Sequence, residues 1–464
     1  MITSRTWAGK RYAVLGLARS GRTTVRALVA SGAEVAAWDG DLEIREALLD
    51  ELIMFAEERD NDEFCFADPL TLDLTGFTAV VVSPGVPLNR HPIAGHAAKY
   101  GVPVIGDIEL FAQARAELPP HKVVGITGTN GKSTTTALVH HILKTAGVPT
   151  TMGGNIGLPI LGQAPLPEGG VYVLELSSYQ IDLTFTLDCD VAVLLNITPD
   201  HLDRYDGFEG YAASKARLFE MQLKGATVVV ANGEPVDGIR ADLESARPNF
   251  KNDWPYPSIE SGSNQPILKW ARPGRVLCAY CPDESQKEWP TLQGPHNGQN
   301  AAGAVEACRL LGLSYNVINE ALRTYPGLPH RMERIREKDG VLYVNDSKAT
   351  NATSTAPALA AYPVIHWILG GQAKTEELDA CVPHLGHVKT AFTIGRDSSM
   401  LADILRGHGV AVSQSVTLDQ AVKRASIAAK PGETVLLSPA CASFDQFKDY
   451  EDRGDQFRAL VGAL

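Results

Sequence analysis

Residues 125–133 read GITGTNGKS and stand between an apolar run, Lys122 to Ile126, and a helical stretch. A strand that enters a helix through a glycine-rich turn presents backbone N–H groups to phosphate oxygens. In such a loop Lys132 supplies positive charge to the β and γ phosphates, and Ser133 offers its hydroxyl to magnesium. The commonest pattern has its first glycine one place later than Gly125. The stretch predicts a nucleoside triphosphate site in a parallel α/β segment.

Polar residues near the ends of the next two predicted strands, residues 171–176 and 191–197, are candidate magnesium ligands. Glu175 and His201 stand there, and parallel strands bring their carboxyl ends to one edge of a sheet. A carboxylate suits magnesium, whereas imidazole is a softer ligand, so His201 is either a site residue or an ordinary loop histidine. Nothing in the composition selects Lys215, which lies in a helical stretch.

The first segment of the chain contains a βαβ unit. A predicted strand, Tyr12 to Leu15, runs into the turn GLARSG at residues 16–21 and a helical stretch, and a second strand ends at Asp39. Ala18 stands where a dinucleotide-binding turn has its middle glycine. A further strand runs into Ser83-Pro84, at the end of the sheet where α/β proteins place ligands. We predict a domain that binds a nucleotide-diphosphate sugar; a purely structural Rossmann-like domain is the alternative.

The chain is predicted to be an α/β protein of three domains. Its 464 residues are too many for one hydrophobic core, because a domain typically holds about 150 residues. Linker-like sequence occurs at residues 117–120 and 326–329, and strands alternate with helical stretches after the second linker, which predicts a mostly parallel sheet. We expect a Rossmann-like domain over residues 1–112, a P-loop ATPase-like domain over 113–327 and a Rossmann-like domain over 328–464.

Composition argues against several classes of protein. A net charge of -12 and a pI near 5.5 disfavour general binding to nucleic acid or anionic membranes, which depends on clustered Lys and Arg. No apolar run approaches the roughly 18 residues that span a bilayer, and the N-terminus leaves no room for a signal peptide. Seven scattered cysteines fit reduced thiols. We expect a cytoplasmic monomer without nucleic-acid partner or membrane span.

Five further strings carry a family resemblance. They are ELSSYQ at 175–180, HLDR at 201–204, HNGQN at 296–300, NDSKATN at 345–351 and SPACASFDQF at 438–447. With the phosphate loop, they make the chain resemble the Mur ligase family over essentially its whole length. The resemblance implies an ATP-dependent ligase that forms an amide bond in peptidoglycan precursor synthesis. The first and the last two strings are similar to the branch that adds D-glutamate to UDP-N-acetylmuramoyl-L-alanine.

The resemblance also implies the cofactors. Lys215 would be carbamylated by carbon dioxide and would bind magnesium in that anionic form. Two magnesium ions are expected, one near Ser133 and Glu175 and the other near His201 and modified Lys215. The implied catalytic residues are Lys132, His201, Lys215 and Arg331.

Three sets of binding residues are carried over from matching positions of the family. The ATP contacts are Gly128, Thr129, Asn130, Gly131, Lys132, Ser133, Thr134, Asn297, Asn300, Arg331 and Asp346. The UDP-sugar contacts are Arg19, Ser20, Asp39, Ser83, Pro84, Asn155, Ser177 and Gln180, together with His201. The glutamate contacts are Lys348, Thr350, Lys374, Ser443, Phe444 and Tyr450. Cations suit the two acidic groups of glutamate, although the bare sequence reads Lys374 equally well as a surface lysine.

The implied reaction passes through an acyl phosphate, which the amine of glutamate then attacks. Two alternatives remain open. One is another Mur or folylpolyglutamate-type ligase with the same ATPase core, and the other is a non-catalytic protein that senses a UDP-sugar or a nucleotide. The chirality of the glutamate acceptor follows from the resemblance alone.

Overall fold

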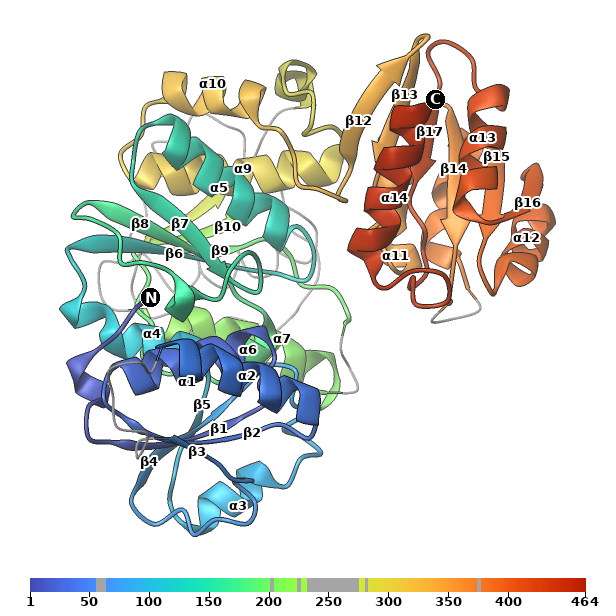
Figure 1. The fold of residues 1–464 in the computed structure, drawn as a ribbon. Helices are drawn as coiled ribbons and strands as arrows, with labels where there is room; N and C mark the ends of the chain where they lie inside the picture. Colours follow the sequence, from blue (N-terminus) through green and yellow to red (C-terminus); the bar gives the residue numbers. More distant parts are fainter. Residues whose placement is uncertain (56–63, 201–203, 223–226, 232–274, 280–282, 374–376) are drawn as a thin grey trace. The chain divides into compact units, whose positions relative to one another are not determined.

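Three β-sheets follow one another along the chain in the computed structural model, each flanked by helices (Figure 1). The structure describes residues 1–55, 64–200, 204–222, 227–231, 275–279, 283–373 and 377–464. The chain divides into two compact units, one of Met1–Tyr280 with Ala302–Asn319 and the other of Cys281–Ala301 with Glu320–Leu464. The first unit contains the first two sheets, and the second unit contains the third.

The first sheet is parallel, with the strand order β3-β2-β1-β4-β5. Its strands are β1 (Arg11–Leu15), β2 (Glu34–Trp38), β3 (Phe64–Phe66), β4 (Phe77–Val82) and β5 (Val104–Ile105). Its helices are α1 (Arg19–Ala30), α2 (Leu42–Phe55), α3 (Ile93–Lys99) and α4 (Asp107–Ala114), and short 3-10 turns lie at η1 (Arg5–Trp7) and η3 (Arg115–Glu117).

Both faces of this sheet are buried. Side chains alternate along a strand, so Tyr12 and Val14 enter the core beneath α1 and α2, whereas Ala13 and Leu15 enter a second core beneath α3 (Figure 1). A strand covered on both faces reads as a continuous apolar run, which is why the run is visible in the sequence.

The second sheet is also parallel, with the order β11-β10-β9-β6-β8-β7. Its strands are β6 (His121–Thr127), β7 (Thr150–Gly154), β8 (Gly170–Glu175), β9 (Val191–Leu194), β10 (Thr227–Ala231) and β11 (Arg275–Ala279). The helices of this part are α5 (Lys132–Thr145), α6 (Ser178–Asp182) and α7 (Gly207–Glu220), with the 3-10 turn η4 (Ile160–Gly162). The 3-10 turn η5 (Asp283–Glu288) belongs to the second unit, and both α9 (Pro295–Leu310) and α10 (Tyr315–Thr324) are divided between the two units.

Strand β6 lies between β8 and β9, and its carboxyl end leads into the phosphate loop. The register pairs Ile126 with Glu175 and Thr127 with Leu194. The phosphate loop, the end of β8 and the segment after β9 therefore meet at one edge of the sheet.

The first two sheets share a hydrophobic core within the first unit. The rings of Phe111 on α4 and Tyr172 on β8 meet edge to face with centroids 5.1 Å apart. Glu109, also on α4, accepts hydrogen bonds from the N–H groups of Phe185 (2.7 Å) and Thr186 (2.9 Å). The turn after β1 and the phosphate loop thus belong to one packed body.

The third sheet has the order β12-β13-β17-β14-β15-β16 and is parallel except for the antiparallel edge strand β12. Its strands are β12 (Glu333–Lys338), β13 (Val341–Asn345), β14 (Ile365–Gly370), β15 (Val388–Ile394), β16 (Val412–Val416) and β17 (Thr434–Leu437). Its helices are α11 (Ala352–Ala360), α12 (Ser398–Gly407), α13 (Leu418–Ala428) and α14 (Tyr450–Ala463), with the 3-10 turn η6 (Asp379–His387).

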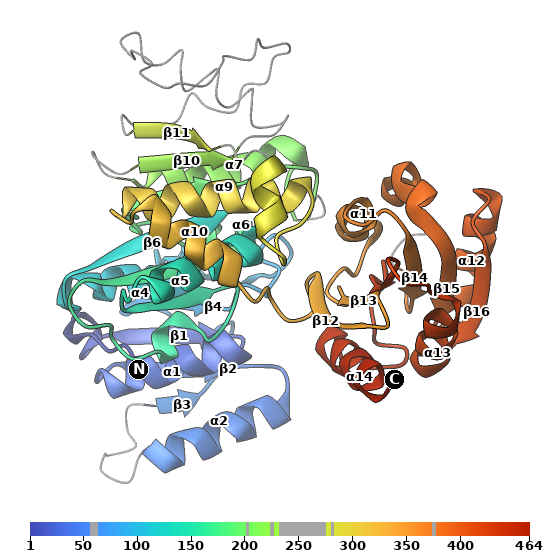
Figure 2. The same cartoon turned by 90° about the horizontal axis from the view of Figure 1, so that it is seen from above.

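Helices cover both faces of the third sheet. Figure 2 shows α11 and α12 on one side and α13 and α14 on the other. Trp367 and Leu369 pack on the first side and Ile368 on the second. The predicted α/β fold class, with its mostly parallel sheets, is confirmed.

Each sheet lies within one of the three predicted domains, while the exact limits at residues 112/113 and 327/328 stay a prediction. In the part of the chain that the structure describes, no helix has the length and apolar character needed to cross a membrane.

Candidate active site

The phosphate loop is bonded to the segment that follows β9. Thr129 N–H donates to the Asn196 carbonyl oxygen (2.9 Å), and Asn130 N–H donates to the Asn196 side-chain oxygen (2.8 Å). Gly128 has a φ of 154°, and a Cβ there would lie 3.0 Å from the Cβ of Leu195. Glycine is required at this position because a side chain would be both strained and crowded. Asn196 was not among the predicted site residues, and nothing in the sequence distinguishes it from other loop asparagines.

Helix α5 begins directly after the loop. Lys132, Ser133 and Thr134 form its first turn, whose N–H groups and helix dipole favour an anion. Ser133 is buried, and the side chain of Lys132 folds back over the loop, where its Nζ donates to the carbonyl oxygens of Gly128 (2.9 Å) and Thr129 (2.8 Å). The predicted strand, loop and helix are all present.

Lys215 reaches the same loop from α7. Its side chain is 1% exposed, and its Nζ donates to the carbonyl oxygen of Gly128 (2.9 Å) and lies 4.6 Å from the ring centroid of Tyr211. Burial, and secondarily the positive charge of Lys132, hold the pKa of Lys215 well below its usual value. The neutral amine, which is the nucleophilic form, is therefore more accessible than in an ordinary exposed lysine. The sequence alone gave no reason to select this lysine.

Glu175 ends β8 with one carboxylate oxygen bonded and the other not. Oε1 accepts from Asn155 Nδ2 (2.9 Å), and Asn155 N–H donates to the Glu175 carbonyl oxygen (2.9 Å). Oε2 is buried and has no hydrogen-bond partner among the described residues. A buried carboxylate oxygen without a donor is costly unless a cation balances it, so this atom fits a magnesium ligand.

Two predicted residues, His201 and Lys374, lie outside the described residues. Across the described ranges, no three or more His, Cys, Asp or Glu side chains gather in a way that could hold a metal. Among the described residues, the Ser133 hydroxyl and a modified Lys215 could add oxygen ligands to the carboxylate of Glu175.

The turn after β1 is braced by two predicted UDP-sugar residues. Asp39 Oδ2 accepts from Leu17 N–H (2.7 Å), and Ser83 Oγ donates to the Gly16 carbonyl oxygen (2.7 Å). A Cβ at Gly21 would lie 1.8 Å from that same carbonyl oxygen. These contacts give Asp39 and Ser83 a structural role in shaping the turn. Ser20 lies in the first turn of α1, which starts here.

Arg19 links this turn to the second sheet. Its guanidinium donates to the Gly157 carbonyl oxygen (2.7 Å), two residues beyond Asn155. Arg204 forms a second link, because it donates to the Val86 carbonyl oxygen (3.2 Å), lies within 3.5 Å of the Pro84 carbonyl oxygen and stands 4.3 Å from the ring centroid of Tyr179. Arg204 was not among the predicted site residues, although it belongs to the HLDR string.

Ser177 and Gln180 bond to each other in a capping box at the start of α6. Gln180 N–H donates to Ser177 Oγ (3.3 Å), and Ser177 N–H donates to Gln180 Oε1 (3.1 Å). Gln180 is buried. The first serine of the ELSSYQ string, Ser177, is therefore explained by local structure, since the capping box satisfies N–H groups at the start of the helix.

In the second unit, Asp346 lies at the end of β13. Its Oδ2 accepts from Ser438 Oγ (2.7 Å) and its Oδ1 from Met332 N–H (3.1 Å). Burial raises the pKa of Asp346 to about 7, against a smaller lowering by these hydrogen bonds and by the charge of Arg331. Two other predicted ATP contacts are buried on α9, where Asn300 Nδ2 donates to Asn297 Oδ1 (3.1 Å).

The predicted glutamate residues gather on the loops after β13 and β17 and at the start of α14. Lys348 Nζ lies 5.1 Å from the ring centroid of Tyr450. Ser443 is buried, whereas Phe444 is 70% exposed beside it. Thr350 is half-buried on the same loop as Lys348. The structure thus brings together five of the six predicted residues on one end of the third sheet.

Arg453, which was not predicted, ties these loops together from α14. Its side chain is fully buried and donates to Ser347 Oγ (2.9 Å) and the Ser347 carbonyl oxygen (2.8 Å) after β13. It also donates to the carbonyl oxygens of Cys441 after β17 (3.1 Å) and Gly370 at the end of β14 (3.4 Å). Burial lowers the pKa of Arg453 to about 10. A lone arginine within a helical stretch gives no sequence signal for this role.

Comparison with known sequences is consistent with this geometry. The family described as "Mur ligase middle domain" matches residues 126–308, and "Mur ligase, glutamate ligase domain" matches residues 330–441. A UDP-N-acetylmuramoylalanine–D-glutamate ligase from Novosphingobium aromaticivorans is 58% identical over 464 residues, which cover 100% of this chain and 97% of the relative. The enzyme of the same name from Sphingopyxis alaskensis is 57% identical, with 100% of both chains covered.

Solved structures show the same architecture at low sequence identity. MurF ligase from Thermotoga maritima in complex with ADP has a TM-score of 0.56 and 14% identity, and the match covers 99% of this chain and 97% of that one. UDP-N-acetylmuramate-alanine ligase from the same organism has a TM-score of 0.54 and 16% identity, with 98% and 99% covered. These two likenesses concern the fold.

Proposed function

The chain belongs to the Mur ligase family and is an ATP-dependent ligase, and we propose that it joins D-glutamate to UDP-N-acetylmuramoyl-L-alanine in cytoplasmic peptidoglycan precursor synthesis. The observation that carries the proposal is the buried Lys215, whose Nζ lies 2.9 Å from the carbonyl oxygen of Gly128 in the phosphate loop. Burial of a lysine side chain costs free energy of folding. A role for its amine in the reaction would explain why a lysine stands at this position.

We propose that Lys215 acts as a carbamate. The neutral amine attacks the carbon of carbon dioxide and loses a proton to water, which leaves an N-carboxylate. The lowered pKa of the Lys215 amine favours the attack on carbon dioxide, because only the neutral amine has a free electron pair. The product would bring a carboxylate to a loop that already carries the positive charge of Lys132.

Magnesium is the proposed metal. Ser133 and Glu175 would hold one ion, and His201 and carbamylated Lys215 the second. A bound magnesium ion neutralises negative charge on the transferring phosphoryl group. The unpartnered Oε2 of Glu175 supports the first assignment.

The reaction we propose has two steps. An oxygen of the alanyl carboxylate bonds to the γ phosphorus of ATP while the bond to ADP breaks, which gives an acyl phosphate. The amine of glutamate then bonds to the acyl carbon, loses a proton and expels phosphate. Lys132 and the N–H groups of residues 128–134 would stabilise the phosphoryl oxygens, and Arg331 would stabilise charge as it develops.

The remaining predicted residues take binding roles in this proposal. Asn297, Asn300 and Asp346 are proposed to contact ATP. The turn after β1, with Arg19, Ser20, Asp39, Ser83 and Pro84, and the residues Asn155, Ser177 and Gln180 are proposed to hold the UDP-sugar. Lys348, Thr350, Lys374, Ser443, Phe444 and Tyr450 are proposed to hold glutamate, with the lysines facing its carboxylates.

The test is product analysis with the purified chain. ATP, UDP-N-acetylmuramoyl-L-alanine and either glutamate enantiomer are supplied, phosphate release is followed, and the product is identified by mass spectrometry. We expect one phosphate for each amide formed, and product with D-glutamate only. Phosphate release that does not depend on glutamate, without a new amide, would refute the proposal in favour of a nucleotide-responsive protein. Product with another amino acid would indicate a different member of the family.

A further inference from the structure

Arg331 stands in a turn whose backbone is left-handed on both sides. His330 has a φ of 61° and Met332 a φ of 47°. Residues other than glycine rarely adopt this backbone conformation, because their Cβ atom crowds the backbone. They keep it only where the surrounding structure holds them in place. Two such residues around one arginine indicate that this part of the chain is held in shape by specific contacts.

Three backbone groups of the turn bond to residues at or just beyond strand ends of the third sheet. Met332 N–H donates to Asp346 Oδ1 (3.1 Å), and the His330 carbonyl oxygen accepts from Lys348 N–H (3.0 Å). His330 N–H donates to Glu333 Oε2 (3.0 Å). The turn is therefore bonded to the loop that carries the proposed ATP and glutamate residues.

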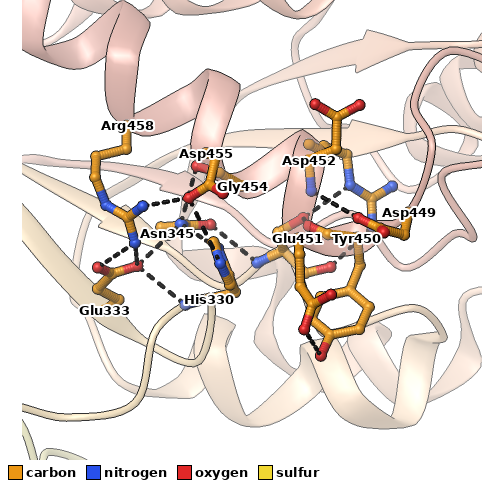
Figure 3. A network of polar contacts seen from close by, with 12 residues as sticks. His330, Glu333, Asn345, Asp449, Tyr450, Glu451, Asp452, Gly454, Asp455 and Arg458 are labelled. Carbon is orange, nitrogen blue, oxygen red and sulfur yellow. Dashed lines mark hydrogen bonds and ion pairs between the residues drawn. The ribbon is translucent and has the colours of Figure 1, made fainter. Parts of the chain in front are cut away.

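The ring of His330 enters a notch on α14, which Figure 3 shows from close by. Asn345 Nδ2 lies 3.1 Å from its Nδ1, and its Nε2 lies 3.7 Å from Asp455 Oδ1. The notch exists because residue 454 is glycine: a Cβ on Gly454 would lie 2.1 Å from Nδ1 of His330. The ring and a side chain at position 454 cannot occupy that space together.

A second connection to α14 comes one helical turn later. Arg458 Nη2 donates to both oxygens of Glu333 (2.7 and 2.9 Å), whose Oε2 also accepts the His330 N–H (Figure 3). Residues 454 and 458 are four apart and share one face of the helix. The same face of α14 thus contacts the ring of His330 and the carboxylate that binds its backbone.

We propose that His330, seated against Gly454, is a positioning residue that fixes the turn from which Arg331 acts. This inference rests on the proposed function, in which Arg331 stabilises charge on the reacting groups. His330 itself need touch no substrate. Its contribution passes through the backbone of the turn, and Gly454 supplies the space that the ring requires.

The test is Gly454→Ala in the full chain, with Gly462→Ala as the matched control. Gly462 lies on the same helix, and a Cβ there would meet no atom within 4 Å. We expect kcat for ligation to fall by about 100-fold in Gly454→Ala, because small misplacement of a catalytic group costs rate on that scale. The KM for UDP-N-acetylmuramoyl-L-alanine should not change, and Gly462→Ala should match the wild type.

A double-mutant cycle with Arg331→Ala separates positioning from general damage. If Gly454 acts through Arg331, Gly454→Ala should lower kcat by less than about twofold once Arg331 is already alanine. An equal loss in both backgrounds would overturn the inference. His330→Asn repeats the cycle without a steric clash, because asparagine tolerates a positive φ but does not fill the notch, and the same masking by Arg331→Ala is expected.

The outcomes also separate this inference from the proposed function. A wild-type protein without ligase activity overturns both. An active wild type with an equally active Gly454→Ala overturns only the role of the notch.

Discussion

Lys132 and Lys215 donate hydrogen bonds to the same carbonyl oxygen, that of Gly128, each over 2.9 Å. Two ammonium groups that meet at one acceptor repel each other, and Lys215 is the more buried of the two. Burial, and secondarily this repulsion, therefore lower the pKa of Lys215. Loss of the positive charge on Lys132 should raise the pKa of Lys215. A smaller fraction of Lys215 would then carry the neutral amine that can react with carbon dioxide.

Carbamylation of Lys215 is the first prediction. In buffer with carbon-13 bicarbonate, the wild type should show a carbamate carbon signal by NMR, and Lys215→Arg should lack it and lose ligase activity. Lys132→Met should weaken the signal, because it removes the charge that favours both the neutral amine and the carbamate anion. Lys144→Arg, at an exposed position of α5, is the control. An undiminished signal in Lys215→Arg would place the modification elsewhere.

Glu175→Gln should lower the affinity for magnesium. Glutamine keeps the size of the side chain and an oxygen for Asn155 Nδ2, but removes the negative charge. Loss of several kcal/mol of charge stabilisation corresponds to a kcat about 1000-fold lower. The melting temperature should stay the same or rise, since a buried carboxylate with one unbonded oxygen is replaced by a neutral amide. ADP formation over a range of magnesium concentrations measures the effect, and the exposed Glu168→Gln is the control. Wild-type magnesium dependence in Glu175→Gln would rule this ligand out.

Gly21→Ala should weaken binding of the UDP-sugar without affecting ATP. The added Cβ would meet the Gly16 carbonyl oxygen at 1.8 Å, so the turn must move. Overpacking of this kind costs about 1–3 kcal/mol, and we expect the KM for UDP-N-acetylmuramoyl-L-alanine to rise by about tenfold or more. Gly95→Ala on α3, where a Cβ meets nothing within 4 Å, should leave both KM values unchanged. A parallel rise in the KM for ATP would indicate general damage instead.

Stability of the third sheet at acid pH should depend on Glu433. Hydrogen bonds from Lys389 and His366 lower the pKa of Glu433 from 4.5 to about 2. The ordinary pKa of 4.5 applies to Glu433 in the unfolded chain, and the pKa in the folded protein is lower. The stabilisation is therefore fully present above pH 4.5 and is lost as the pH falls toward 2. Glu433→Gln should lower the free energy of unfolding at pH 7 by about 1 kcal/mol, a modest effect because Lys389 is partly exposed.

The measurement for Glu433→Gln is urea unfolding at several pH values, followed by tryptophan fluorescence in a background in which the buried Trp367 is kept and the other five tryptophans are replaced by phenylalanine. The difference between wild type and variant should shrink as the pH falls from 4.5 to 2. Glu337→Gln, on the exposed side of β12, should show a much smaller difference throughout. A constant gap between wild type and Glu433→Gln would contradict the assignment.

The central strands and the phosphate loop were predictable because their signals are local. A strand buried on both faces, such as β6, reads as an apolar run, and the glycines that follow have a backbone reason to be there. Shorter or more polar strands were not predicted: β3 is short, β16 is polar, and β7 contains Gly153 and Gly154. The predicted strand at residues 191–197 was too long, since β9 ends at Leu194.

The candidate site was predictable only where chemistry and local pattern coincide. Glu175 ends one strand and Lys132 begins the helix that follows another, and the carboxyl ends of parallel strands lie at one edge of a sheet, which suggested that they meet. Lys215 and Arg453 lie within helices, and their importance comes from burial, which is a property of packing between distant segments. Neither residue type nor spacing distinguishes them from surface residues of an ordinary helix. The family resemblance supplied Lys215, and Arg453 emerged from the structure.

Arg453 has a consequence for efforts to change the amino acid that this ligase accepts. Its guanidinium binds three separate segments of the chain, namely those at the carboxyl ends of β13, β14 and β17. A change of length or of backbone in any one of these segments would therefore disturb the other two. We therefore expect that single substitutions of proposed glutamate contacts such as Lys348 or Phe444, with the loop lengths unchanged, will alter the preferred amino acid more readily than replacement of whole loops.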